Sequence, residues 1–257
     1  MAKLLSLGAG VDSRNNGFTP LLAAAYSGFS DVCEVLLGLG KADIEDTIPL
    51  DERTALSLAS SMGHVSTVTL LLSHGARVDN RSTNGFTPLL TAAQHGHTKV
   101  CELLLERGEA SVKERSLKGF TPFLVAAQGG HSDVCELLLA HGSDIEERQP
   151  VTLDTALHEA AIFGYENLLN LLISHKADVN SRDRIGTTPL HLASQEGHIS
   201  SVMAVLEAGA DPLLPQEDGD LPIHCAASRN QTEVVKLLIE RARCSPDQVK
   251  TYFNKTK

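Results

Sequence analysis

The sequence predicts an all-α solenoid of paired antiparallel helices joined by short β-hairpin-like fingers, and three observations support this. The sequence of residues 85–108 recurs in closely similar form at residues 119–142. The Thr that opens the first helix of each unit returns at spacings of 33 to 35 residues, and such a period indicates a supersecondary unit stacking on copies of itself. Start and stop signals for two helices recur in every unit. The opening positions are Thr19, Thr54, Thr87, Thr121, Thr155, Thr188 and Leu221.

The first helix of each unit is expected to begin after this Thr, which can cap the free amides of the first turn. Pro follows at four of the Thr positions, where its missing N–H costs nothing, and Ala replaces it at Ala55 and Ala156. A glycine is expected to end this helix in a left-handed conformation. These glycines are Gly28, Gly63, Gly96, Gly130, Gly164 and Gly197.

The second helix is expected over the apolar run that follows, such as Val-Cys-Glu-Leu-Leu-Leu in the third and fourth units. Five glycines are expected to stop it, and Lys176 and Ala242 depart from that rule. Segments such as 177–186 then turn back to the next unit as a two-stranded finger. The stopping glycines are Gly40, Gly75, Gly108, Gly142 and Gly209.

Composition restricts the class of partner. Apolar residues make up 42% of the 257 residues, aromatic residues only 4%, and Trp is absent, so we expect a core of Leu, Ala and Val. The formal net charge of −10 argues against nucleic acid and anionic membranes as partners. No apolar stretch is long enough to cross a bilayer, and the first ten residues do not resemble a secretory signal. The odd count of five Cys favours a reducing compartment, so we expect an intracellular, cytoplasmic monomer, with the nucleus as an alternative location.

Several segments resemble the ankyrin repeat: TPLHLAS (188–194), GHISSV (197–202), EAGADP (207–212) and HKADVN (175–180). The resemblance covers about residues 3–244. It implies a curved stack whose fingers and first helices line a concave groove, and a non-enzymatic scaffold that binds other proteins. We expect one domain over 1–257, with a half repeat at 3–15 and a capping helix at 245–257. The expected repeats are 16–48, 50–83, 84–117, 118–151, 152–185, 186–218 and 219–244.

The cysteines and histidines have structural interpretations. Cys33, Cys101 and Cys135 share a position that holds Val or Leu in the other repeats, which indicates a buried small apolar residue. Cys225 is expected to pack in a first helix, and Cys244 is the thiol expected to be exposed. His158, His191 and His224 occupy the TPLH position, where the resemblance implies a hydrogen bond to the backbone of the neighbouring finger. Repeats one to four carry other residues there, namely Leu22, Ser57, Leu90 and Leu124.

No catalytic or metal-binding motif is present. The sequence lacks a nucleophile elbow, a phosphate loop, HExxH and CxxC, so we expect no enzyme, no cofactor and no metal. Successive His positions of a solenoid lie too far apart to ligate one ion. The spacing of Leu172, Asp178 and Asn180 resembles Asn-hydroxylation sites of ankyrin repeats, so Asn180 is a candidate for modification, with an ordinary finger Asn as the alternative.

The resemblance places partner contacts at the residue before the opening Thr and at the end of each first helix. We expect a groove with an apolar half in repeats one to four and an acidic half in repeats five to seven. It would suit an extended segment with hydrophobic anchors and basic residues. The candidate binding residues are Phe18, Tyr26, Arg53, Met62, Phe86, Gln94, His95, Phe120, Gln128, Asp154, Ile162, Phe163, Glu196 and Asp220.

Alternatives stay open at this stage. The phenylalanines could instead pack between fingers and rigidify them. Arg53 could stack on the flanking rings or accept a carboxylate of a ligand. The fingers at 46–53 and 147–154 lack the usual Gly, and they either add specificity or are tolerated insertions. The array as a whole could be a spacer or a self-association element within a larger multidomain protein.

Overall fold

The computed structural model describes residues 12–39 and 41–241, and it divides the chain into two compact units at Ser143 and Asp144. Unit 1 contains α2 (Pro20–Ser27), α3 (Ser30–Gly38), α4 (Ala55–Ser61), α5 (Val65–Ser73), α6 (Pro88–Gln94), α7 (Thr98–Glu106), α8 (Pro122–Gln128) and α9 (Ser132–Ala140). Unit 2 contains α10 (Ala156–Phe163), α11 (Glu166–Ser174), α12 (Pro189–Glu196), α13 (Ile199–Glu207), α14 (Pro222–Ser228) and α15 (Thr232–Arg241).

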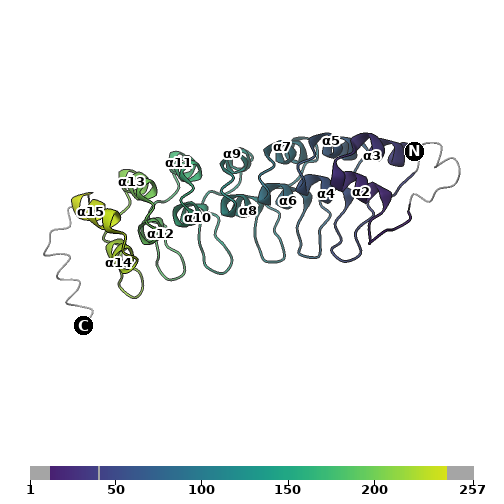
Figure 1. Cartoon of the computed structure of the whole chain (residues 1–257). Coiled ribbons are helices and arrows are strands. Elements are labelled where there is room, and N and C mark those ends of the chain that lie inside the picture. Colours follow the sequence, from purple (N-terminus) through teal and green to yellow (C-terminus); the bar gives the residue numbers. More distant parts are fainter. Residues whose placement is uncertain (1–11, 40, 242–257) are drawn as a thin grey trace. The chain divides into compact units, whose positions relative to one another are not determined.

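Each unit has two helical layers (Figure 1). In unit 1, α2, α4, α6 and α8 pack side by side as first helices, and α3, α5, α7 and α9 form the second layer. In unit 2, α10, α12 and α14 form the first layer, and α11, α13 and α15 the second. The fingers extend from the first-helix layer as loops. Within the described residues they carry only the isolated bridges Asn15–Phe18 and Thr47–Thr54, so the expected all-α solenoid with hairpin-like fingers is confirmed.

The helix starts follow the predicted capping chemistry. The Thr19 hydroxyl accepts a hydrogen bond from the Leu22 amide at 3.4 Å, and Thr54, Thr87 and Thr121 cap α4, α6 and α8 in the same way. Proline occupies the first turn where the sequence places it. The core is made of the expected Leu, Ala and Val, joined by the fully buried Phe123.

The first-helix glycines have two roles. All six adopt positive φ, between 67° at Gly164 and 80° at Gly197, as predicted. A Cβ added to Gly28 would lie 2.7 Å from the imidazole of His64, and one added to Gly63 would lie 2.7 Å from His97. These positions therefore need glycine both for its left-handed backbone and for the space that the next repeat's histidine occupies.

Second helices end in more varied ways than the sequence indicates. Gly75, Gly142 and Gly209 are left-handed as expected, and Lys176 adopts φ 67° where a glycine is missing. Gly108 is not left-handed. Glu109 after it takes φ 56°, and a Cβ on Gly108 would meet Val78 at 2.6 Å. Gly108 therefore serves close approach between repeats rather than the turn.

Some expectations lie outside the described residues. These are residues 3–11 of the half repeat, Gly40, Cys244 and the capping helix at 245–257. The single-domain interpretation and the repeat boundaries stay predictions, while the seven helix pairs of the described residues follow the expected order.

Candidate protein-interaction surfaces

Histidines after the first-helix glycines connect neighbouring repeats, a role that sequence analysis missed. The Nε2 of His64 lies 3.0 Å from the Tyr26 carbonyl oxygen, and Nε2 of His97 lies 2.9 Å from that of Ser61. His131 and His198 make the same contact to the preceding repeat. In the last repeat Gln231 substitutes, because its amide donates to the Gln195 carbonyl at 3.2 Å. The recurrence of His at this position was the available signal.

Arginines at the base of the fingers form a second missed set of connections. Arg14 donates to the Thr47 carbonyl at 2.8 Å, and Arg81 to the Arg115 carbonyl at 2.7 Å. In unit 2, Arg148 donates to the carbonyl of the next finger's Arg182 at 2.7 Å. Backbone bonds add to this network, for example from the Leu117 amide to the Asn84 carbonyl at 3.0 Å. The fingers within a unit are thus fixed relative to one another and present an ordered edge.

Two of the three TPLH histidines of unit 2, His158 and His191, behave as the family resemblance implies. The ring of His224 accepts the Leu221 amide at Nδ1, and its expected bond to a finger backbone stays a prediction. Nε2 of His158 donates to the Thr187 carbonyl at 3.0 Å, and Nε2 of His191 donates to the Asp220 carbonyl at 3.1 Å. On the other side of each ring, Nδ1 accepts the amide of Thr155 or of Thr188. Burial lowers the pKa of His158, and it lowers the pKa of His191 to about 4, so both rings are neutral.

The residues before the opening Thr are half-buried in both units except Thr187, which is buried, and the fold holds their backbones in place. The Phe86 amide donates to the Ser82 hydroxyl at 3.1 Å, and the Phe120 amide donates to Ser116 at 3.2 Å. The Phe18 ring lies edge-on to Tyr26, with centroids 6.2 Å apart. The Phe18 ring therefore contacts its own repeat, and all three phenylalanines are half-buried, which is compatible with both partner binding and packing.

Arg53 is engaged by its own finger. Its Nε donates to the Asp51 carboxylate at 2.6 Å, and both side chains are about one third exposed. Arg53 belongs to the second repeat, and Phe18 and Phe86 occupy the same position in the first and third repeats. Asp51 thus holds the guanidinium within the second repeat's own finger. A ligand carboxylate at Arg53 would have to share it with Asp51.

The helix-end residues are the more exposed set. Tyr26 and Met62 in unit 1 are 44% and 43% exposed, and Phe163 in unit 2 is 54% exposed. His95 stacks on His97 with ring centroids 6.0 Å apart, which aligns it with the inter-repeat histidines. The remaining candidates are accessible to different degrees. Gln94 and Glu196 are exposed, whereas Gln128, Ile162, Asp154 and Asp220 are half-buried.

The sequence-predicted residues therefore form two sets, one on each unit. Unit 1 carries Phe18, Tyr26, Arg53, Met62, Phe86, Gln94, His95, Phe120 and Gln128, all on first helices or fingers. Unit 2 carries Asp154, Ile162, Phe163, Glu196 and Asp220 in the equivalent places. The first set is dominated by apolar side chains, and the second combines carboxylates with one apolar pair.

The fingers at 46–53 and 147–154, which lack the usual Gly, contain one extra residue each. In the regular finger the Gly85 amide donates to the Ser82 carbonyl, three residues back. Glu52 donates instead to Ile48 and Leu153 to Gln149, four residues back, and both donors take positive φ. The turn is thus longer by one residue and exposes Leu50 and Val151 at its tip.

Asn180 makes hydrogen bonds to the following finger. Its Oδ1 accepts the Asp211 amide at 2.8 Å, and its Nδ2 donates to the Gly209 carbonyl at 3.4 Å. This is the arrangement of an ordinary structural finger Asn. Hydroxylation of Asn180 stays a prediction.

The remaining candidate chemistry is buried. Cys33, Cys101 and Cys135 are fully buried free thiols, and Cys225 is nearly so, as the sequence indicates. Burial raises the pKa of Cys101 and of Cys135 to about 12. Across residues 12–39 and 41–241 no cluster of three or more His, Cys, Asp or Glu side chains could hold a metal ion. None of the helices in those ranges is long and apolar enough to cross a membrane.

Comparison with family models identifies the repeat. The model described as "Ankyrin repeats (3 copies)" matches residues 39–116, 74–149, 107–183 and 157–250. The model described as "Ankyrin repeat" matches residues 16–47. Together these matches extend over most of the chain.

Curated relatives match over shorter segments. Ankyrin repeat and KH domain-containing protein mask-1 of Caenorhabditis elegans is 34% identical over 106 residues, which are 41% of this chain and 4% of that protein. Ankyrin repeat and KH domain-containing protein 1 of Homo sapiens is 38% identical over 86 residues, which are 33% of this chain and 3% of that protein. The matched segments thus span a few per cent of these relatives' lengths.

Solved structures match over nearly the whole fold. The human ASB11 ankyrin repeat domain has a TM-score of 0.78 at 26% identity, covering 87% of this chain and 98% of that one. The ankyrin repeat domain of Bcl-3, described as a member of the IkappaB protein family, has a TM-score of 0.73 at 27% identity, covering 86% and 100%. Ankyrin repeat domains are in general non-enzymatic protein–protein interaction modules. The family models, the relatives and the repeated helix pairs agree that this chain belongs to the ankyrin repeat family.

Proposed function

We propose that the chain is a non-enzymatic scaffold or adaptor that binds a segment of another protein on the face formed by its first helices and fingers. The observation that supports this most is the exposure of large apolar side chains at the first-helix ends, where Tyr26, Met62 and Phe163 are each more than 40% exposed. Exposed large apolar groups that recur at equivalent positions of repeats are typical of interaction sites.

The two units differ in the chemistry that they offer. On unit 1, Phe18, Phe86 and Phe120 add ring edges to Tyr26 and Met62, which suits hydrophobic anchors of a partner. On unit 2, Asp154, Glu196 and Asp220 add carboxylates, which suits basic residues. A hydrophobic partner segment would thus suit the unit 1 set, and a basic segment would suit the unit 2 set.

Replacement by threonine tests the role of the phenylalanines. Thr187 occupies the same position in the sixth repeat, so the fold accepts Thr there. We would select peptides that bind the wild-type protein and measure their affinity for a variant with Phe18→Thr, Phe86→Thr and Phe120→Thr. The proposal predicts at least a ten-fold loss of affinity with helicity retained.

The matched control replaces apolar residues away from this face. Leu39, at the end of α3, and Val65, in α5, are 67% and 41% exposed. A double variant with Leu39→Ala and Val65→Ala should bind the selected peptides as the wild type does. If the threonine variant binds normally, the phenylalanines are not part of the surface. If it unfolds instead, they serve packing.

A second candidate function is self-association within a larger protein. Leu50 and Leu117, at the tips of unit 1 fingers, are 91% and 77% exposed, and they offer an apolar edge to another copy. Sedimentation velocity separates the candidates. A concentration-dependent dimer that dissociates on Leu50→Ser and Leu117→Ser would favour self-association, and a monomer at all concentrations would favour the adaptor.

A further inference from the structure

Helix α13 in unit 2 carries smaller side chains than the other second helices at two positions one turn apart. Where α13 has Ser201, the equivalent residues are Val or Leu in five of the other six repeats and Thr67 in the second. Where α13 has Ala204, all six others have Leu or Val. The equivalents of Ala204 are Val35, Leu70, Leu103, Leu137, Leu171 and Leu237. Two neighbouring truncations remove the volume that fills the space between second helices elsewhere.

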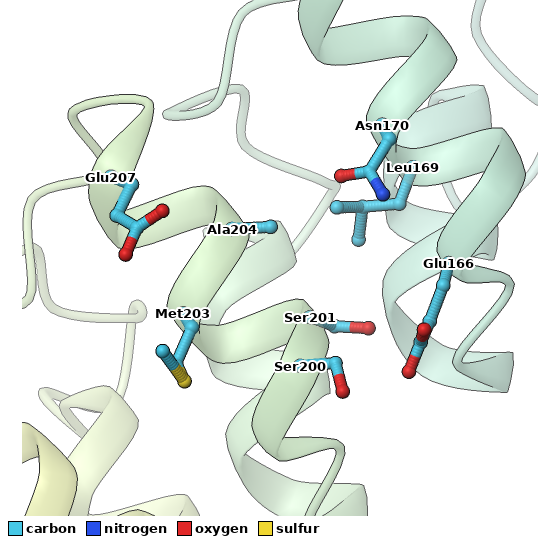
Figure 2. A pocket seen from close by; sticks show the side chains of 8 residues that line it. All are labelled: Glu166, Leu169, Asn170, Ser200, Ser201, Met203, Ala204 and Glu207. Carbon is cyan, nitrogen blue, oxygen red and sulfur yellow. The ribbon is translucent and has the colours of Figure 1, made fainter.

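A pocket of about 300 Å³ lies at this place, between α11 and α13. Figure 2 shows the pocket lining, with three residues from α11 and five from α13: Glu166, Leu169 and Asn170, and Ser200, Ser201, Met203, Ala204 and Glu207. Leu169, Met203 and Ala204 give the pocket an apolar part, and the polar groups lie around them. The pocket is on the second-helix layer, whereas the proposed partner surface is on the first-helix layer and fingers.

Ser201 supplies an unpaired polar atom in the pocket. The residue is 1% exposed, and its hydroxyl has no hydrogen-bond partner among the described residues. Figure 2 shows the hydroxyl pointing from α13 towards α11. A buried hydroxyl without a partner is costly, so a group that enters the pocket and bonds to it would recover that loss.

Carboxylates define the charge of the ligand. Glu166 begins α11 and Glu207 ends α13, and both side chains are exposed at the pocket. Glu207 lies 3.6 Å from Arg241 of the next helix, whereas Glu166 has no cationic partner among the described residues. With a chain charge of −10 around it, the pocket favours a cation.

We propose that this pocket binds an arginine side chain presented by a basic segment of a partner protein. The aliphatic stem of arginine matches the contacts offered by Leu169, Met203 and Ala204. The acceptors are spread over two helices: the Glu166 carboxylate and Asn170 amide oxygen on α11, and the Ser201 hydroxyl on α13. A planar guanidinium with five donors reaches separated acceptors at once, whereas the compact ammonium of lysine does not.

The test uses a blocked Gly-Gly-Arg-Gly-Gly peptide as the probe, titrated into the full chain and followed by NMR chemical shifts. We expect binding of about millimolar strength, which is reasonable for one side chain in a small pocket. Shift changes should centre on α11 and α13. The citrulline peptide, which has the same shape without the charge, and the lysine peptide should each bind at least ten-fold more weakly.

Two variants and one control decide whether the pocket itself binds. The double variant Ser201→Val/Ala204→Leu restores the residues of the other repeats, so it should abolish binding while its Tm is unchanged or higher. Glu166→Gln lies at an exposed position and should weaken binding several-fold without affecting the fold. The control Thr67→Val removes the equivalent buried hydroxyl in unit 1, which is likewise unpaired, and should leave binding unchanged.

The proposal is wrong if the filled double variant binds the arginine peptide as the wild type does, or if citrulline or lysine binds equally well. Should the double variant fail to fold, Glu166→Gln alone decides, and unchanged affinity in that variant contradicts the proposal. Affinity that persists while the pocket is filled would indicate general attraction to an acidic surface.

Discussion

Mild acid should destabilise unit 2 through its buried TPLH histidines. His158 and His191 accept a backbone amide at Nδ1 and donate from Nε2 to a carbonyl, so each ring must be neutral in the folded state. Burial is the main cause of the lowered pKa at both residues. At His191, Arg182 lowers the pKa further, while the Asp220 hydrogen bond and the Asp183 and Asp218 carboxylates oppose the shift.

The size of the effect follows from the two pKa values of His191. Its folded pKa is about 4 and its ordinary value is 6.5, so the unfolded chain binds the proton over this window and the folded chain does not. The free energy of unfolding therefore decreases as the pH drops from 6.5 towards 4. It is recovered when the pH is raised. Between about pH 7 and about pH 5, linkage gives a loss of about 2 kcal/mol from His191 alone. The pKa of His158 is also lowered by burial, so His158 adds to this loss of stability.

Hydrogen exchange with mass spectrometry measures this unit by unit. After correction for intrinsic rates, peptides from α10 and α12 should lose protection between about pH 7 and about pH 5 more than peptides from α4 to α8. A double variant His158→Leu/His191→Leu introduces the residue that Leu90 and Leu124 provide in unit 1. It should be less stable at neutral pH, because the finger carbonyls lose their donor, but its unit 2 should be nearly insensitive to this pH change. Equal pH dependence in the variant and the wild type would refute the role assigned to the histidines.

Three further predictions concern buried thiols, glycines and a strained finger. Cys101, with its pKa raised to about 12, should resist alkylation at about pH 8 in the folded protein and react in urea, and rapid native labelling would contradict its burial. Gly63→Ala should cost about 2 kcal/mol or more in urea unfolding because of its φ and the His97 ring. The control Gly75→Ala has positive φ and no atom within 4 Å, so it should cost less, and equal losses would exclude a role for the contact. Leu153→Gly should raise stability by up to about 1 kcal/mol by relieving the strain at φ 66°, and a lower Tm would show that the Leu153 side chain packs in a way that outweighs it.

Local signals in the sequence predicted the architecture well, because each repeat contains residues that start and end its own helices. The Thr caps, the prolines after them and the six first-helix glycines all lie where their chemistry requires. The burial of Cys33, Cys101 and Cys135 followed from comparing one position across repeats. These features depend on contacts within a repeat or between identical neighbours, which a periodic sequence reveals.

Hydrogen bonds from a side chain to the backbone of another repeat were harder to predict. The bond from His64 to the Tyr26 carbonyl joins a side chain to a backbone atom 38 residues away, and a residue pattern does not name a carbonyl partner. The left-handed residue lies at Glu109 rather than Gly108, and Gly108 instead leaves space for Val78 of the preceding repeat, a contact that the residue pattern does not name. The signal for the pocket at Ser201 and Ala204 is an alignment of the repeats, in which both residues are smaller than their equivalents.

The role of the residues on the candidate surface follows least directly from the sequence. The phenylalanines before the opening Thr are half-buried, so their composition suits both partner binding and packing. Exposure separates them from Tyr26, Met62 and Phe163, which project further into solvent. The two unusual fingers proved to be one-residue extensions, and their effect on specificity stays a prediction.

A hydrogen-exchange footprint of a selected peptide on the wild-type chain tests the central claim most directly. The account predicts that binding protects the first-helix ends and fingers of unit 1, around Tyr26, Met62 and Gln94, and leaves exchange in α5 and α7 unchanged. Protection confined to the second helices, or no protection at the finger and first-helix face while the peptide is bound, would contradict it.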